Sequence, residues 1–280
     1  MALDWQGPAT AGLARLSYSL HQQLAREHDG ENVYGYRTLK CLNAHVRVPD
    51  SSHGDQLVDP ILARSGIQLR RLPPGMGAAS TKWLQGRNVT SLDLLSEEDT
   101  TAQVHPLLFT RTLWDMARAR GVRYVKGCPS SWDQDAKTLT VDTSAGPQEY
   151  QADTLVVAAG PWSGLVTKQL LGLHVPIFDL PGHSVLIRPS EPLPAHAVFA
   201  QVHMPGATET TELFARPDGL VYVAGENNGA PLPEGTADVK VDDSLVRRLT
   251  SASAAISDAL RLGTVEAQQV IAFGDFMVVI

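Results

Sequence analysis

The stretch ADTLVVAAGPWSG, residues 152–164, constrains the fold more than any other segment. Its β-branched and small apolar residues predict a buried strand, and a helix is expected to begin soon after Pro161. Two alanines and Gly160 remove side-chain bulk at the junction. Ligands of open α/β sheets bind beyond the carboxyl ends of strands, so a ligand approaching the backbone is one interpretation. The alternative is a tight turn with Trp162 filling the core.

Composition indicates an ordinary globular chain. Its 280 residues are 43 % hydrophobic and 19 % charged, which allows two domains. The net charge of −7 argues against a nucleic-acid partner, and no apolar run predicts a membrane span or a secretory signal. Cys41 and Cys128 are expected to be reduced thiols, and the scattered histidines predict no metal site. We therefore expect a cytoplasmic protein, with the peroxisome or another organelle left open.

The first two-thirds of the chain mixes helices with strands. Leucines spaced by three and four residues predict a helix over 10–28, and alternation predicts a strand over 38–48. A helix over 111–120 and three strands are also predicted, at 122–125, 138–142 and 153–158. This order favours the edge of a doubly wound α/β domain.

After about Val175 the pattern changes to short alternating runs divided by glycine and proline. The turn RPDG, residues 216–219, lies between two such runs and predicts a β-hairpin. One amphipathic helix is expected over 241–260. The fold class is therefore α/β plus antiparallel β, with segments of the two interleaved along the chain.

Five segments, taken in order, resemble the D-amino-acid oxidase and glycine oxidase superfamily. ADTLVVAAGPWSGLV resembles its second flavin-contacting segment: an acidic residue, an apolar strand, Ala-Gly, any residue and Trp-Ser. TAQVHPLLFTRTLWDMARARGV resembles the His/Asp-Pro motif and the helix after it, whereas LPGHSVLIRPS and ELFARPDGLVYVAGE resemble substrate-domain strands. ALDWQGPATAGLARLSYSLHQQLAREHDG resembles the helix after the first dinucleotide-binding unit, especially in fungal members. The resemblance covers residues 2–270.

This resemblance implies an incomplete FAD-binding doubly wound domain and an interleaved antiparallel-sheet substrate domain. The first would comprise residues 1–30 and 102–174, and the second residues 31–101 and 175–280. FAD would lie beside four residues of the opening stretch: Ala159, Gly160, Pro161 and Trp162. Pro129 occupies the place of a family valine whose backbone binds the adenine. Because proline has no N–H, only its carbonyl could serve.

The resemblance also implies an FAD-dependent oxidoreductase in which hydride passes from a small amine or amino acid to the flavin. The substrate-side candidates are His105, Arg188, Arg216 and Glu226, each of which is equally consistent with a packed or solvated polar side chain. An arginine could bind a substrate carboxylate with two parallel hydrogen bonds. No catalytic residue is implied, since the family often operates on an unprotonated amine.

Two departures from the family pattern leave other functions open. The family's G-x-G-x-x-G turn would fall before residue 1, and the nearest local candidate, GMGAAS at 75–80, follows two prolines instead of a strand. We therefore expect FAD to bind this chain weakly or not at all. The alternatives are a truncated, non-catalytic binding protein and, on GMGAAS alone, an NAD-dependent dehydrogenase. The second departure is at the other end, where the family's glycine-rich strand and helix that return to the FAD domain would be expected. The sequence VEAQQVIAFGDFMVVI ends there on an apolar run, which predicts an exposed strand that favours self-association.

Overall fold

The computed structural model describes residues 1–48, 70–71, 81–84, 88–226, 229–233 and 238–276. The chain divides into two compact units, which are described separately. Unit 1 comprises Met1–Met116, His183–Glu226 and Val241–Gln269, and unit 2 comprises Ala117–Gly182, Asn227–Lys240 and Val270–Ile280. These units place residues 1–30 with the large sheet, so their bounds differ from the predicted domains. Which residues belong to a cofactor domain stays a prediction.

Within the described residues, the large sheet has eight strands in the order β13-β9-β12-β11-β10-β2-β4-β3. In that order the strands span Thr264–Phe276, Ile177–Arg188, Val221–Glu226, Ala207–Ala215, His196–Met204, Lys40–Arg47, Val89–Ser96 and Arg70–Arg71. Strands β9, β12, β11 and β10 pair antiparallel in turn, as do β2 and β4, whereas β10 and β2 are parallel. The predicted antiparallel strands after Val175 are confirmed, in a mixed sheet.

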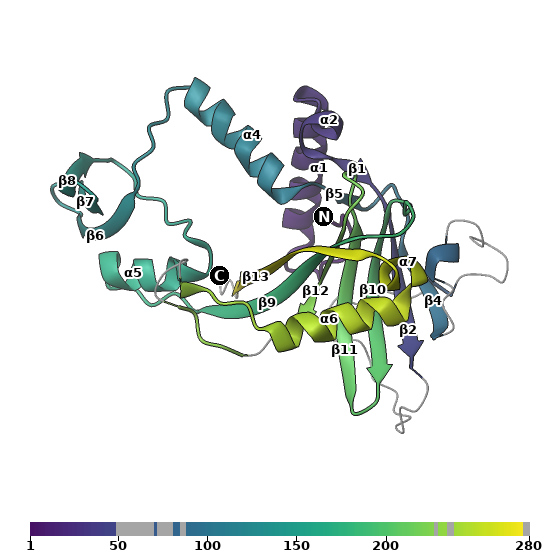
Figure 1. The fold of residues 1–280 in the computed structure, drawn as a ribbon. Coiled ribbons are helices and arrows are strands. Elements are labelled where there is room, and N and C mark those ends of the chain that lie inside the picture. Colours follow the sequence, from purple (N-terminus) through teal and green to yellow (C-terminus); the bar gives the residue numbers. More distant parts are fainter. Residues whose placement is uncertain (49–69, 72–80, 85–87, 227–228, 234–237, 277–280) are drawn as a thin grey trace. The chain divides into compact units, whose positions relative to one another are not determined.

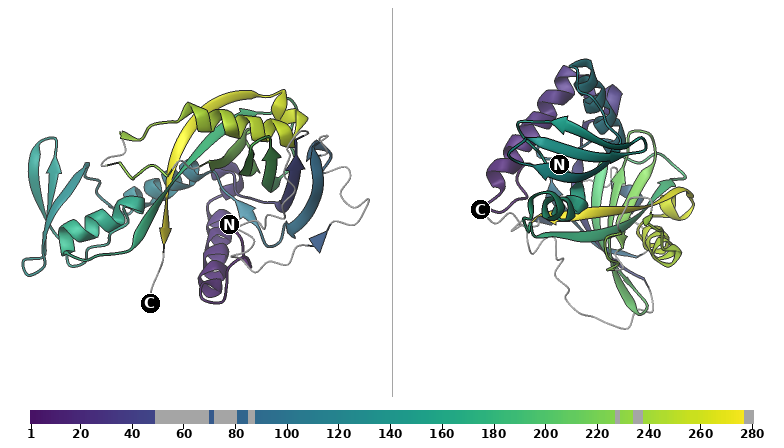
Figure 2. Two further views of the ribbon diagram at one scale, coloured as in Figure 1. Left: turned by 90° about the horizontal axis from the view of Figure 1, so that it is seen from below. Right: turned by 90° about the vertical axis from the view of Figure 1, so that its left-hand side faces the viewer.

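Helix α6, Asp243–Ile256, lies along one face of this sheet, as Figures 1 and 2 show. Its Leu249 and Ile256 are fully buried in one cluster with Val198, Leu213 and Val223 of the sheet. The N-cap carboxylate of α6 accepts a hydrogen bond from the Ser244 N–H. The predicted helix over 241–260 is interrupted by an extended Ser257, after which α7 spans Asp258–Arg261.

The other face of the sheet carries a second apolar cluster. Leu39, Cys41, Ala197 and Phe199 are buried there, and Trp5 packs edge-on against Phe199 with ring centroids 5.3 Å apart. Successive residues of β10 therefore enter different clusters, which explains why this strand reads as a continuous apolar run. Unit 1 also contains a short sheet of β1, Arg37–Thr38, and β5, Ala102–Gln103.

Helices α1, α2 and α4 belong to the described residues before the middle of the chain. The helix expected over 10–28 is confirmed as α1, Ala11–Glu27, and α2 follows over Gly30–Tyr34. The predicted start at Arg111 was wrong, because α4 spans Pro106–Ala119. A proline suits the first helical turn, where its missing N–H would have no acceptor within the helix. Gly121, with a φ of +88°, follows the helix end as expected.

Unit 2 contains an antiparallel meander followed by a helix. Strands β6, β7 and β8 span Gly127–Asp133, Thr138–Thr143 and Gly146–Gln151, and β7 confirms one predicted strand. The predictions of strands at 122–125 and 153–158 were wrong, since neither segment pairs with any described part of the chain. Both keep exposed apolar side chains, Tyr124 at 70 % and Val156 at 79 %. Strand-forming residues do not make a strand without a partner.

Two predictions remain untested by the fold. The stretch GMGAAS at 75–80 lies outside the described residues. Strand β13 stands at one end of the large sheet, and association of copies through it stays a prediction. Among the described helices, none has the length and apolar character needed to cross a bilayer.

Candidate functional site

The turn before helix α5 is the cofactor-side candidate. Residues Gly160–Trp162 form the short 3-10 helix η2, and α5 spans Ser163–Leu171. Gly160 has a φ of +55°, and a Cβ added there would meet no heavy atom within 4 Å. The backbone itself therefore requires a glycine, and open space lies where a side chain would stand. Both interpretations of this stretch, ligand approach and tight turn, fit this geometry.

Trp162 is anchored within the same unit. Its half-buried indole donates a hydrogen bond from Nε1 to the carbonyl of Pro233 at 2.8 Å. From the sequence we expect this indole to stand partly exposed at the mouth of a groove, without a complete set of partners of its own. It is partly exposed, but its single hydrogen-bond donor has a partner. A contact between this ring and a cofactor stays a prediction.

Pro129 lies on strand β6, opposite Val141, at an irregularity in the pairing with β7. Its carbonyl accepts a hydrogen bond from Nε2 of Gln169, on α5, at 3.2 Å. The atom proposed for the adenine contact therefore already has one partner, although a carbonyl oxygen can accept two. Helix α5 connects this strand with the Gly160 turn, so these two parts of the predicted site share one supporting element.

In unit 1, His105 and Arg216 belong to one polar cluster. His105 precedes α4, and its backbone N–H donates to the carbonyl of Tyr34 at 2.8 Å. Arg216 lies in the turn between β11 and β12, where its guanidinium donates to the Asp218 carboxylate. The pKa of His105 lies below its ordinary value, mainly because the ring is partly buried and also because the positive charge of Arg216 is near. The structure thus brings these two predicted residues into electrostatic contact, with the imidazole predominantly neutral at pH 7.

Arg37 joins this cluster from strand β1. Its Nη2 donates to the carbonyl of Ala215, to which Gln103 Nε2 also donates at 2.9 Å. The Nε atoms of Arg37 and Arg216 are buried and have no hydrogen-bond partner among the described residues. Two guanidinium groups therefore lie near one carboxylate, Asp218, which also opposes the effect of burial on the Arg37 pKa. Their unused donors suit an anion with several oxygens, such as a carboxylate.

The other two substrate-side candidates have different surroundings. Arg188 donates from Nε to a carboxylate oxygen of Glu266 at 2.6 Å, and both side chains are exposed. Glu226 ends strand β12 and pairs in register with His183 after a bulge at Gly225. Besides Glu266, the negative charge of Asp218 in the polar cluster raises the pKa of Arg188, so Arg188 is coupled to that cluster through charge alone.

Sequence reasoning missed two members of the polar cluster, Arg37 and Asp218. Arg37 lies in a two-residue strand, which is too short to show any periodicity. Asp218 is part of the RPDG signal, which was interpreted only as a turn. Among the described residues, no group of three or more His, Cys, Asp or Glu side chains is arranged to hold a metal ion.

Comparison with known proteins gives a consistent match. The DAO family model, described as FAD dependent oxidoreductase, matches residues 3–271. The Schizosaccharomyces pombe protein C1F5.03c, named as an oxidoreductase, is 30 % identical over 263 residues, covering 86 % of this chain and 61 % of its own length. TDA3 of Saccharomyces cerevisiae, also named as an oxidoreductase, is 26 % identical, and the match covers 84 % of this chain and 51 % of TDA3. The chain thus spans about half to three-fifths of these relatives.

Solved structures share the fold at low sequence identity. Glycine oxidase from Geobacillus kaustophilus superposes with a TM-score of 0.71 at 18 % identity, covering 97 % of this chain and 69 % of that protein. Iminodiacetate oxidase from Chelativorans sp. BNC1 gives a TM-score of 0.69 at 19 % identity, and the match covers 99 % of this chain and 72 % of that protein. At this identity the likeness establishes the fold alone.

Proposed function

Because the chain belongs to the family of FAD-dependent oxidoreductases, we propose that it functions in the oxidation of a small amine or amino acid. The observation that carries this proposal is the open backbone at Gly160, within the segment that resembles the family's flavin-contacting motif. When bound, FAD supplies the hydride acceptor for a C–H bond beside an amine nitrogen. The names of the two similar structures, glycine oxidase and iminodiacetate oxidase, support small amines as the substrate class.

The residues of the turn fit a flat cofactor on one side. Ala159 and Gly160 present little or no side chain, and nothing within 4 Å would oppose a group approaching Gly160 from the side of its absent Cβ. Pro161 and the anchored indole of Trp162 would give that approach a rigid border. We propose that these four residues contact FAD, and that the Pro129 carbonyl accepts a further hydrogen bond from it.

The polar cluster of unit 1 is proposed to hold the substrate carboxylate. Arg37 and Arg216 offer guanidinium donors that stay charged at any physiological pH. His105 is predominantly neutral, so it would contribute a hydrogen bond without adding a further positive charge. An amino acid bound here would be oriented by its carboxylate, and removal of hydride from its Cα requires no general base if the amine is unprotonated.

An anaerobic reduction experiment tests the proposal. The chain is mixed with excess FAD, and candidate amines and amino acids are added while the flavin absorbance bands near about 370 and 450 nm are followed. We expect a small amino acid or secondary amine to bleach the band at the longer wavelength faster than in a protein-free control. Arg216→Gln should slow bleaching by an amino acid more than bleaching by the corresponding amine, which has no carboxylate. Bleaching equal to the control for every compound would support the non-catalytic alternative.

A further inference from the structure

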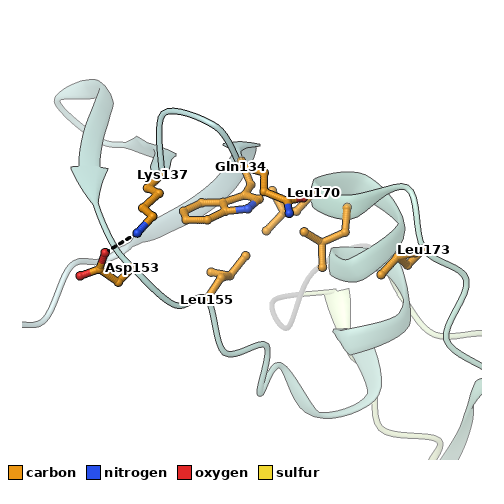
Figure 3. A pocket seen from close by; sticks show the side chains of 8 residues that line it. Gln134, Lys137, Asp153, Leu155, Leu170 and Leu173 are labelled. Carbon is orange, nitrogen blue, oxygen red and sulfur yellow. Dashed lines mark hydrogen bonds and ion pairs between the residues drawn. The ribbon is translucent and has the colours of Figure 1, made fainter.

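Unit 2 contains a cavity of about 600 Å³ that the cofactor and substrate assignments do not use. It is lined by residues of the meander, of the segment after β8 and of helix α5 and its end (Figure 3). None of its lining residues belongs to the Gly160 turn or to the His105 cluster. Its volume falls within the range of small-molecule sites, roughly 300–1,000 Å³.

The walls of this cavity are mostly apolar. The cavity is lined by Trp132 of β6, by Leu155 of the segment after β8, and by Leu170 of α5. Leu173, just after α5, also lines it and has 57 % of its surface exposed. An indole and several leucines would gain from covering an apolar ligand group, because each would lose contact with water. The walls thus favour a branched aliphatic or aromatic substituent.

One ion pair is the charged feature of the cavity. Lys137 Nζ lies 2.7 Å from Oδ1 of Asp153, with side-chain exposures of 55 % and 90 % (Figure 3). Exposed pairs of this kind contribute little to stability, because water solvates both charges when the pair is separated. A ligand that replaces both partners could therefore separate them at small cost.

The backbone conformation at Lys137 is one that a lysine adopts unfavourably. Lys137 has a φ of +51°, a conformation that favours glycine or asparagine over a long side chain. The turn that precedes it is held by Asp133, whose Oδ1 accepts hydrogen bonds from the N–H groups of Asp135 and Ala136. Neither the turn nor the exposed ion pair explains why a lysine occupies this position. A ligand-binding role for its ammonium group does.

We propose that this cavity binds a zwitterionic α-amino acid with an apolar side chain. Its carboxylate would bind Lys137, its ammonium group would bind Asp153, and its side chain would pack against Trp132 and the leucines. A ligand with only one charge would engage one member of the ion pair and leave the other to water, so it would gain one charge-assisted hydrogen bond instead of two. The rim carries one positive and one negative charge, which are the two signs that the ends of a zwitterion require.

Isothermal titration calorimetry of the full chain, without FAD, tests this site independently of the flavin proposal. L-Phenylalanine is compared with phenylacetate, phenethylamine and glycine, which each lack one of its three groups. We expect L-phenylalanine to bind, and we expect each of the other three compounds to have a dissociation constant at least about tenfold higher. Equal binding of phenylacetate or phenethylamine, or no heat from L-phenylalanine at millimolar concentration, would overturn the proposal.

Three variants sharpen the result. Lys137→Gly removes the ammonium group while suiting the backbone, so the thermal midpoint should hold or rise as L-phenylalanine affinity falls roughly tenfold or more. Asp153→Asn should weaken binding to a similar degree. Lys168→Gln, an exposed lysine on α5 outside the cavity lining, is the matched control and should leave affinity unchanged. If Lys137→Gly binds as tightly as the unmodified chain, the proposed site is wrong.

Discussion

The indole N–H of Trp83 donates a hydrogen bond to Nδ1 of His196, across 3.2 Å, inside unit 1. The rings are nearly parallel, at 27° with centroids 6.3 Å apart, and the two residues are only 8 % and 4 % exposed. Because Nδ1 accepts this bond, the imidazole is neutral and carries its proton on Nε2. Trp83 and His196 are 113 positions apart, so the contact joins distant segments of the chain.

This pair predicts a loss of stability in mild acid. Burial, helped by the charges of Lys40 and Arg37, lowers the pKa of His196 to about 4. When folding lowers the pKa of a histidine, the resulting stabilisation is fully present above the unfolded pKa of about 6.5. As the pH falls from about 6.5 to about 4, the free energy of unfolding should decrease by on the order of 3 kcal/mol. Urea unfolding at pH 7 and at pH 5 measures the part of this decrease that falls between those two pH values.

His196→Gln is the control for this effect, because glutamine does not titrate. The variant should be less stable at pH 7, where it loses a packed ring, but its stability should change less between pH 7 and pH 5. An unchanged pH dependence in His196→Gln would assign the acid sensitivity to other groups.

Replacing Gly225 or Gly206 with alanine should lower stability by very different amounts. Gly225 has a φ of +149°, and a Cβ there would stand 2.0 Å from the carbonyl oxygen of Thr210. Gly225→Ala should therefore cost more than about 3 kcal/mol of unfolding free energy, because backbone atoms must move. Gly206 also has a positive φ, +79°, but its Cβ would meet nothing within 4 Å. Gly206→Ala should cost only about 1 kcal/mol, as chemical denaturation would measure. Similar losses would show that backbone angle, and not crowding, governs both sites.

The fold could be predicted from sequence wherever the signal is local. The leucine spacing of α1 and the turn residues Arg216–Gly219 between β11 and β12 identify those elements without any knowledge of the remaining chain. The segments 122–125 and 153–158 have equally strong strand composition but no described partner. Pairing is a property of two segments, and propensity describes only one.

The candidate site follows the same rule. Family resemblance pointed to His105 and Arg216 separately, but their proximity depends on where the β11–β12 turn lies relative to the start of α4. Arg37 could not be found from sequence, because one arginine in a two-residue strand resembles any surface arginine. The ion pair of Lys137 and Asp153 was missed because its members come from a turn and an irregular segment.

Weak flavin binding by these 280 residues is a further prediction. The pattern G-x-G-x-x-G does not occur in them, and a pyrophosphate bound at such a turn gains several charge-assisted hydrogen bonds. At roughly 1.5–3 kcal/mol each, the absence of two or three of them weakens binding by several powers of ten. Titration should give a dissociation constant for FAD above about 1 μM. A submicromolar value would mean that other residues of this chain bind the phosphates.

The last prediction separates the two interpretations of Gly160. Because its φ is +55°, Gly160→Val should lower the thermal midpoint whether or not a cofactor approaches, since a β-branched residue is strained there. Gly160→Asn adds similar bulk into the open space, but asparagine tolerates this conformation at a cost of about 1 kcal/mol or less. If FAD passes over this backbone, Gly160→Asn should nearly keep its thermal midpoint and yet weaken FAD binding roughly tenfold or more. The thermal midpoint is measured by calorimetry and FAD affinity by titration to high micromolar concentration. Ser144→Asn, at an exposed turn in the same unit, provides the control for added bulk elsewhere. If Gly160→Asn binds FAD as the unmodified chain does, the glycine serves the turn alone.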